Sequence, residues 1–154
     1  MAAWLKLITV GRPRRGPFRE LEQTYLERIG RYARYERHGI DPSRRRSAGE
    51  RRREEARAIG RHLGAGPTVV ALDAGGRALD SAAFRDRLCR WRDTGGAALV
   101  VGGPDGHARE VLDTAHETIA LGPMTLPHEL AFIVLLEQIY RALADEQGHP
   151  YAAH

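Results

Sequence analysis

Cysteine is almost absent from this chain. Cys89 is the only cysteine among 154 residues, so no intrachain disulfide can form. This excludes the disulfide-stabilised secreted scaffolds and is typical of a protein from a reducing compartment. Cys89 lies in a helical pattern beside Leu88 and Trp91, without a partner motif. We therefore interpret it as a packed thiol and not as a nucleophile.

Long apolar runs are also missing. The N-terminal run, residues 4–10, is too short for a signal peptide or a membrane span, and no other run is long enough either. We expect a soluble, cytoplasmic protein that is not exported and that contacts no membrane. Its length predicts a single domain, residues 1–154, whose core buries roughly 70% of the extended surface.

Lysine is the third rarity. Of the 24 basic residues all except Lys6 are arginine, and 20 acidic residues leave a net charge of +4. Arginine suits phosphate groups and exposed bases better than lysine does. Arg12, Arg14 and Arg15 have no acidic neighbour before Glu20, so we predict that these three contact a polyanion.

A second arginine cluster lies further along the chain and has two interpretations. Its members are Arg44, Arg45, Arg46, Arg51, Arg52 and Arg53. Glu50, Glu54 and Glu55 lie among them and partly neutralise their charge. The pattern fits a solvated helix face with ion pairs as well as it fits a polyanion contact.

Apolar residues recur alternately at strand and helix spacing. Strands are predicted at residues 4–10, 35–40, 68–72, 97–101 and 117–121, and helices at 17–32, 47–64, 81–94, 111–115 and 127–147. Ser47 stands three residues before Glu50 as a capping box, and residues 73–76 read as a loop that ends the third strand. This alternation predicts an α/β fold with a right-handed parallel sheet and helices on both faces.

The last predicted helix is apolar on every side at residues 130–136. A helix of this kind must be covered all round, and in a thin domain a second subunit is the simplest cover. We therefore predict a dimer, with burial in the chain's own core as the alternative.

Two loops rich in glycine and proline stand out. Residues 102–106, Gly-Gly-Pro-Asp-Gly, and residues 121–126 each follow an apolar strand and lead into a helix. Such loops leave main-chain amides free and hold small ligands at the carboxyl ends of strands. His107 and His116 are predicted on the surface near the first loop, without metal-ligand spacing, so we expect no metal site. No Ser-His-Asp arrangement or complete dinucleotide motif is present.

Four ordered motifs carry a resemblance to a known family. They are residues 101–106, residues 121–128, residues 135–142 (Leu-Leu-Glu-Gln-Ile-Tyr-Arg-Ala) and residues 148–151 (Gly-His-Pro-Tyr). Together with residues 7–11 and the Leu72-Asp73 turn, they make the chain resemble the RlmH-type 23S rRNA pseudouridine N3-methyltransferases of the SPOUT class over nearly its whole length.

The resemblance implies an α/β fold with a C-terminal trefoil knot, a homodimer, and S-adenosylmethionine as cofactor. Carried over by position, the cofactor contacts are Leu72, Gly103, Leu121, Gly122, Pro123, Met124, Thr125 and Leu126. These residue types fit, because glycine lets the main chain approach a ligand while leucine and methionine can sandwich adenine.

The resemblance also implies candidates for catalysis and for contact with 23S rRNA in the ribosome. The sulfonium already activates the methyl group, so the protein has to align the base nitrogen and supply a positive field. The catalytic candidates are Arg141, Tyr151 and His154, and the RNA-binding candidates are Arg12, Arg14, Arg15, His128 and His149. For Arg141 an ion pair with Glu137 one turn earlier is the structural alternative, and for His128 it is helix capping.

The chain departs from the family pattern at two places. Ala152 and Ala153 follow the Pro-Tyr pair where a histidine and often a basic residue are usual, and Phe132 replaces an arginine early in the last helix. Both places are expected to meet RNA or the partner's cofactor. The alternatives to an rRNA methyltransferase are therefore a non-catalytic ribosome-binding or RNA-binding protein that retains the knot, and a methyltransferase with another RNA target.

Overall fold

The computed structural model describes residues 2–153 and contains one five-stranded sheet. All neighbouring strands pair in parallel, in the order β2-β1-β4-β3-β5. The strands are β1 (Leu5–Val10), β2 (Tyr35–Ile40), β3 (Thr68–Ala78), β4 (Ala97–Val101) and β5 (Glu117–Ala120). The helices are α1 (Pro17–Ile29), α2 (Ala48–Leu63), α3 (Ser81–Asp93), α4 (Arg109–Thr114), α5 (His128–Glu146) and the short 3-10 helix η1 (Pro150–Ala153). The predicted parallel α/β architecture is confirmed.

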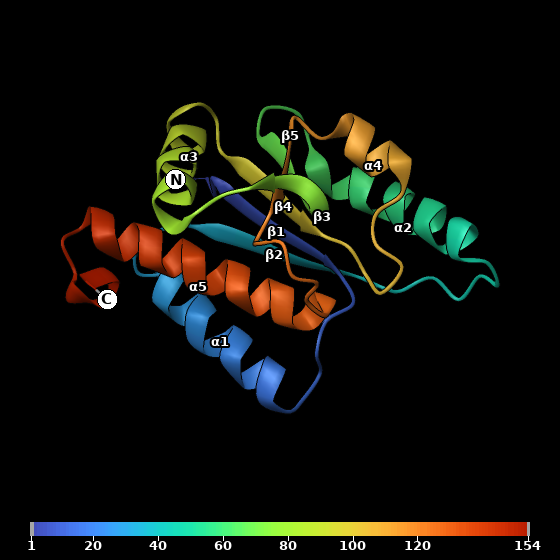
Figure 1. Ribbon diagram of the computed structural model, residues 1–154, viewed down its shortest axis with the longest axis horizontal. Coiled ribbons are helices and arrows are strands. Elements are labelled where there is room, and N and C mark those ends of the chain that lie inside the picture. The colour runs from blue at the N-terminus through green and yellow to red at the C-terminus, as the bar shows by residue number, and fades with distance from the viewer. Residues whose placement is uncertain (1, 154) are drawn as a thin grey trace.

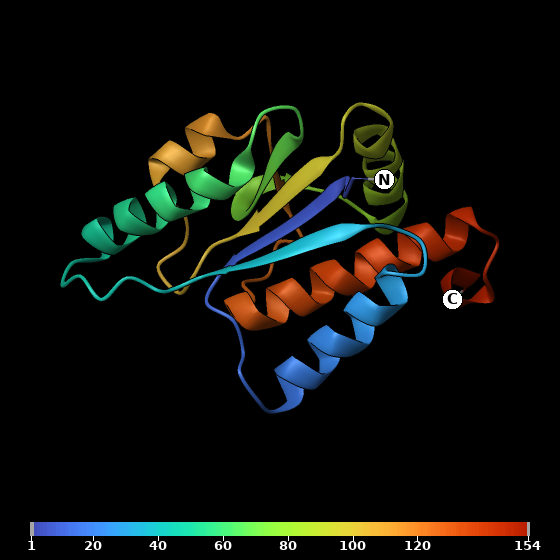
Figure 2. The same cartoon turned by 180° about the vertical axis from the view of Figure 1, so that it is seen from behind.

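Helices cover both faces of the sheet, as Figures 1 and 2 show. One face packs against α1, α3 and α5, and the other packs against α2 and α4. The strands supply alternate residues to the two cores: in β1, Leu5 and Leu7 join the first core while Ile8 and Val10 join the second. This alternation explains why the central strands read as continuous apolar runs, since both faces of a parallel sheet are buried.

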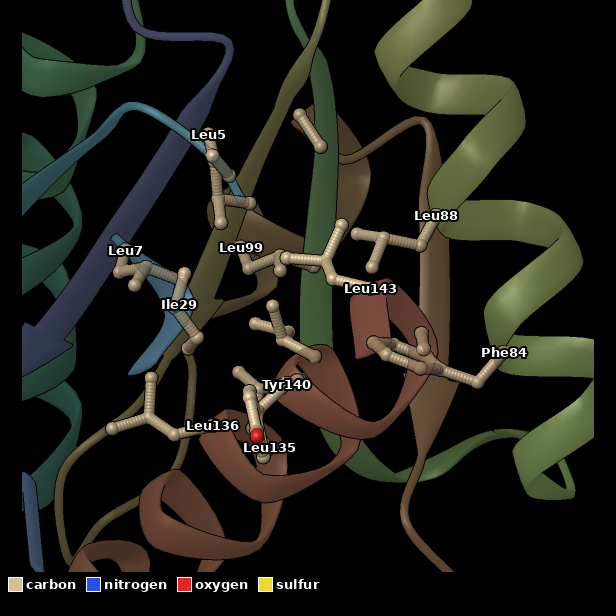
Figure 3. Packing of buried hydrophobic residues seen from close by; sticks show 14 of the residues in the cluster. Leu5, Leu7, Ile29, Phe84, Leu88, Leu99, Leu135, Leu136, Tyr140 and Leu143 are labelled. Atoms are coloured by element: carbon tan, nitrogen blue, oxygen red, sulfur yellow. The ribbon is translucent and has the colours of Figure 1, made fainter. Parts of the chain in front are cut away.

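The core on the α5 side contains the largest group of buried side chains. Figure 3 shows Leu5, Leu7 and Leu99 of the sheet in the same core as the α5 residues Leu135 and Leu136. All five are fully buried. The chain itself therefore covers most of α5, and the second subunit that we expected as its cover is left only the half-exposed strip of Leu130, Ala131 and Val134.

Capping side chains set the start of two helices. The Ser47 hydroxyl accepts a hydrogen bond from the Glu50 main-chain N–H at 3.1 Å, and Asp80 accepts one from the Ala83 N–H at 2.8 Å. The predicted Ser47 cap is thereby confirmed, because its oxygen satisfies an amide that has no partner inside the helix. Helix α1 ends at Ile29, three residues before the predicted end.

Strand β3 continues beyond its predicted end. Leu72 and Arg77 both pair with Ile119 of β5, so residues 73–76 bulge out and the strand then resumes. The prediction that residues 73–76 end the strand is therefore wrong. A Cβ atom on Gly76 would lie 2.8 Å from main-chain atoms of Thr118 and Ile119, so the two segments cross where only glycine fits.

No helix among residues 2–153 is long and apolar enough to cross a lipid bilayer.

Candidate functional site

A cleft of about 540 Å³ opens beyond the carboxyl ends of β3, β4 and β5. Its wall includes residues 72–74 at the irregularity in β3, residues 101–104 with 106 and 107 at the end of β4 and in the loop that follows, and residues 119–122 with 124–128 at the end of β5 and in the loop that follows. Ala131 of α5 closes the cleft. Ligands of parallel α/β proteins bind at this edge of the sheet, and the volume suits a small-molecule ligand. The fold thus brings the two predicted ligand-binding loops together.

Seven of the eight predicted cofactor contacts line this cleft. They are Leu72, Gly103, Leu121, Gly122, Met124, Thr125 and Leu126. Pro123 is exposed and is not part of the cleft wall. The two loops come from positions some twenty residues apart, and the sheet brings them together because only β3 lies between the strands β4 and β5 that they follow.

The cleft wall is mostly apolar and carries little charge. Asp73 is the only Asp, Glu, Lys or Arg among the described lining residues. The side chain of Met124 is 82% exposed, although methionine is an apolar residue that usually packs inside. Gly122 has a φ of 152°, which an L residue rarely adopts, so the loop shape depends on glycine there. Such a wall suits an uncharged heterocycle read by main-chain groups.

The first glycine loop is held by Arg51 from α2. Its Nε and Nη2 atoms donate to the two carboxylate oxygens of Asp105 at 2.7 and 3.1 Å. This fork-shaped contact lowers the pKa of the Asp105 carboxyl group. Gly106 N–H also donates to the Gly103 carbonyl at 2.9 Å, which closes the turn. The loop is thus held by a hydrogen bond of its own main chain and by an ion pair with α2.

His107 lies in the cleft wall, so its predicted surface position is wrong. Its Nε2 atom is 3.2 Å from the Val100 carbonyl oxygen, and its buried Nδ1 has no hydrogen-bond partner in residues 2–153. Burial lowers the pKa of the ring and outweighs the nearby carbonyl groups and the Asp73 carboxylate. The position of His107 directly after the first glycine loop was the feature of the sequence that could have predicted its place in the cleft wall. His116 is exposed as predicted, and its Nδ1 accepts a hydrogen bond from the Val69 N–H at 2.9 Å.

His128 lies at the first turn of α5 and contributes to the same wall. No side-chain hydrogen bond caps α5, so the capping alternative for His128 is not realised. The imidazole instead stands where the main cleft adjoins a small apolar pocket formed with Phe18, Phe132 and Ile133.

Arg141 and Tyr151 lie at the other end of α5, away from the cleft. Ten residues of helix separate Arg141 from Ala131, a rise of about 15 Å, and Figure 1 shows the C-terminus packed at the far end of α5. The structure therefore does not bring these two predicted catalytic residues into the cleft of their own chain.

Glu137 joins the two residues into one cluster. Its Oε1 atom accepts hydrogen bonds from Arg141 Nη2 at 2.7 Å and from the Tyr151 hydroxyl at 3.1 Å. The Arg141–Glu137 ion pair predicted as an alternative is thus present. Burial and the hydrogen bonds with Tyr25 and Glu137 raise the pKa of Tyr151, so its phenol stays protonated at neutral pH. His149 Nδ1 accepts from the Tyr151 N–H at 3.1 Å, and His154 lies outside the described residues.

The predicted polyanion-binding arginines lie on the loop after β1. Arg14 and Arg15 are exposed, and their side chains make no ion pair with any described residue. Arg12 is also exposed, but its Nε atom is 4.0 Å from Glu22. Arg12 thus has an acidic neighbour in space that the order of residues does not reveal, because α1 brings Glu22 back toward it.

Arg37 is a buried charged residue beside the small apolar pocket, and the sequence did not reveal its position. It lies in β2 with its side chain 4% exposed, and its Nε atom is 2.5 Å from Glu22, which is equally buried. The Arg37 guanidinium also lies over the ring of Phe132, 4.4 Å from the ring centroid. A charged residue in a short, weakly predicted strand gave no signal of this contact.

No group of three or more histidine, cysteine, aspartate or glutamate side chains within residues 2–153 is arranged to hold a metal ion.

This chain is similar to known methyltransferases over nearly its whole length. The family model described as predicted SPOUT methyltransferase matches residues 4–152. Ribosomal RNA large subunit methyltransferase H of Anaeromyxobacter sp. (strain Fw109-5) is 45% identical over 150 residues, which cover 96% of this chain and 97% of that protein. The protein of the same name from Nitrobacter hamburgensis is 44% identical over 155 residues, with 96% and 97% covered. The chain belongs to the SPOUT methyltransferases, in the group formed by the ribosomal RNA large subunit methyltransferase H proteins.

Proposed function

We propose that this protein is an S-adenosylmethionine-dependent methyltransferase that modifies N3 of a pseudouridine in 23S rRNA of the large ribosomal subunit. The observation that carries the proposal is the cleft in which seven predicted cofactor contacts converge. The full-length similarity to proteins named as large subunit rRNA methyltransferases supports this substrate class. The chain acts as a single domain, residues 1–154, with the trefoil knot implied by its family, and works in the cytoplasm.

The residues present in the cleft fit this cofactor. When bound, S-adenosylmethionine supplies a methyl group that its sulfonium has already activated for transfer. Leu72, Met124 and Leu126 offer apolar surface to the adenine, and the main chain of residues 121–126 offers amides and carbonyls to its edge. Gly103 lets the first glycine loop pack closely on β1, since a Cβ atom there would lie 3.0 Å from a Val10 methyl carbon.

The catalytic cluster is supplied by the second subunit of a homodimer. Arg141 lies near the end of α5 and Tyr151 lies in η1, both remote from the cleft of their own chain, and His154 follows them in the sequence. We therefore assign all three to the cleft of the partner. Arg141 provides a positive field for the negative charge that develops on the base. Tyr151 positions the base as a protonated hydrogen-bond donor, because the raised pKa of Tyr151 rules out the phenolate. Glu137 fixes both side chains.

RNA is held by residues around the mouth of the cleft. Arg12, Arg14 and Arg15 contact phosphate groups, and His128 lies at the cleft wall where the target base enters. His149 lies beside Tyr151 and contacts RNA near the partner's cleft. Phe132 is buried, so its departure from the family pattern no longer favours a non-catalytic binding protein. The alanines of the tail are the departure that still does.

Methyl transfer tests the proposal directly. Purified protein with radiolabelled S-adenosylmethionine is expected to label ribosomes that carry the pseudouridine, and Arg141→Ala is expected to lower incorporation strongly. Mapping of the methylated nucleotide identifies the target. Incorporation no higher than that of Arg141→Ala, combined with no calorimetric binding of S-adenosylmethionine, would favour the non-catalytic alternative.

A further inference from the structure

The loops that follow β1 and β2 lie side by side at the edge of the sheet that holds the cleft. Gly11 N–H donates to the Ile40 carbonyl at 2.7 Å, which joins the ends of the two strands. A Cβ atom on Gly39 would lie 3.1 Å from Arg12 Cβ, so the first loop packs directly on β2. In Figure 1 both loops lie at the right-hand end of the sheet, with the loop that follows β4.

Arg51 connects the second of these loops to the cleft wall. Its Nη1 atom donates to the carbonyl oxygens of Arg45 and Arg46 at 3.0 and 2.8 Å, while Nε and Nη2 hold Asp105. The buried Glu55 adds a second tie, because it accepts a hydrogen bond from the Ser43 N–H at 2.9 Å. One guanidinium group therefore sets the distance between residues 45–46 and the glycine loop of the cleft.

The structure sorts five of the six arginines of the second cluster into two groups, while the sixth, Arg53, is exposed on α2. Arg45 pairs with Glu54 at 2.7 Å, Arg51 pairs with Asp105, and Arg52 Nη1 lies 3.4 Å from the Asp105 carbonyl oxygen. The guanidinium groups of these three arginines already have partners within the chain. The side chains of Arg44 and Arg46 are exposed and make no ion pair or hydrogen bond with the residues that the structure describes.

We propose that Arg44 and Arg46 bind phosphate groups of the RNA substrate and, with Arg14 and Arg15, form one basic rim beside the cleft. The inference rests on the proposed function and adds to it a second RNA-binding loop. Unpaired arginines release counterions when they meet phosphate, whereas arginines already paired with carboxylates gain little. Arg51 holds the main chain of this rim against the cleft wall, so RNA bound there is directed toward the cofactor.

An RNA partner fits the rim better than an acidic protein does. Protein interfaces usually have aromatic or aliphatic anchors at their centre. Among described residues the exposed large hydrophobic side chains are Leu21 and Met124, and neither belongs to residues 11–16 or 41–47. Interfaces with nucleic acid are more polar and much more positive, as this rim is.

The test compares two double variants of equal charge. Arg44→Ala/Arg46→Ala removes the proposed contacts but keeps the main-chain carbonyl that Arg51 holds at Arg46. Arg31→Ala/Arg61→Ala is the control, because both arginines are exposed and follow or end helices at the opposite edge of the sheet. Binding to a protein-free 23S rRNA fragment that contains the target is measured by fluorescence anisotropy between about 50 and 200 mM salt.

The rim variant is expected to bind RNA about tenfold more weakly and to lower the slope of log K against log salt by about 2, while the control keeps the wild-type slope. Equal slopes for the rim variant and the wild type would overturn the proposal. The proposal would also be overturned if the rim variant bound the protein-free fragment as tightly as the wild type does but bound ribosomes more weakly. That result would favour a ribosomal protein as the partner.

The same variants separate this proposal from the proposed function. Calorimetric affinity for S-adenosylmethionine is expected to stay unchanged in the rim variant, and methyl transfer to ribosomes is expected to show a raised KM with a similar kcat. If the wild type transfers no methyl group while the rim variant still loses RNA affinity, the methyltransferase proposal fails and the rim stands.

Discussion

The guanidinium of Arg37 in β2 lies over the ring of Phe132 in α5, and both side chains are buried. The family pattern has an arginine at the position of Phe132. In this chain the guanidinium group of Arg37 from β2 lies 4.4 Å from the centroid of the Phe132 ring, which is a cation–π contact. Phe132, the unusual residue in the last helix, is therefore part of the core and does not face the solvent, and it is Arg37 that pairs with Glu22.

Glu22→Gln is expected to destabilise the protein by about 3–5 kcal/mol, because it leaves the Arg37 charge buried without its partner. Burial already lowers the pKa of Arg37, which shows that the charged form is held at a cost. Urea denaturation measures the change. Glu27→Gln in the same helix is the control, since Glu27 is exposed and should shift the free energy of unfolding by less than about 0.5 kcal/mol. Similar values for both variants would contradict the prediction.

Gly76→Ala is expected to destabilise the protein by about 1–3 kcal/mol or more, because the new Cβ atom meets the main chain of β5, which cannot move aside like a side chain. The matched control is Gly60→Ala in α2, where a Cβ atom meets nothing within 4 Å. That substitution should stabilise the helix by roughly 0.5–1 kcal/mol. Thermal unfolding of both variants checks the opposite signs, and a neutral Gly76→Ala would refute the close crossing.

Met124→Ala is expected to weaken binding of S-adenosylmethionine by about tenfold while leaving the stability of the free protein unchanged. The side chain is 82% exposed, so its removal leaves no cavity, whereas a bound adenine would lose its apolar cover. Isothermal titration calorimetry measures the affinity. Leu21→Ala, which removes another exposed apolar side chain on α1, should bind the cofactor as the wild type does. Unchanged affinity of Met124→Ala would remove Met124 from the site.

The stability of the protein is expected to fall as the pH drops below about 6.5, the ordinary pKa of histidine. Burial lowers the pKa of His107 in the folded state, so below pH 6.5 the unfolded chain binds more protons at this residue. Its contribution to stability is fully present above pH 6.5 and is lost as the pH falls toward the folded-state pKa. Urea denaturation at several pH values should show a weaker dependence for His107→Leu than for the wild type. Identical dependence would mean that His107 is not held neutral.

Two inactive variants are expected to restore activity when they are combined in one dimer. Thr125→Trp fills the cleft, and Arg141→Ala removes the cation of the catalytic cluster. If each active site takes its cleft from one chain and Arg141 from the other, mixed dimers contain one intact site and co-expression gives about a quarter of wild-type activity. Methyl incorporation into ribosomes measures this. No recovery, with mixed dimers present, would place both groups in the same chain.

The alternation of strands and helices and the two glycine loops could be predicted from the sequence alone. Residues 97–101 and the loop after them are recognisable because a strand buried on both faces and a glycine turn each leave a local signature. Seven of the eight predicted cofactor contacts, which the resemblance implies, line the cleft in the structure.

Tertiary structure alone decided which distant side chains meet. Nothing local predicts that Arg51 reaches Asp105, that Arg37 lies over Phe132, or that Gly76 crosses Ile119, because each contact depends on how strands are ordered in the sheet. It also decided which arginines are already paired and which remain exposed. The sequence gives the net charge of the chain, whereas the free energy of each charged group depends on the neighbours that it has in the folded protein.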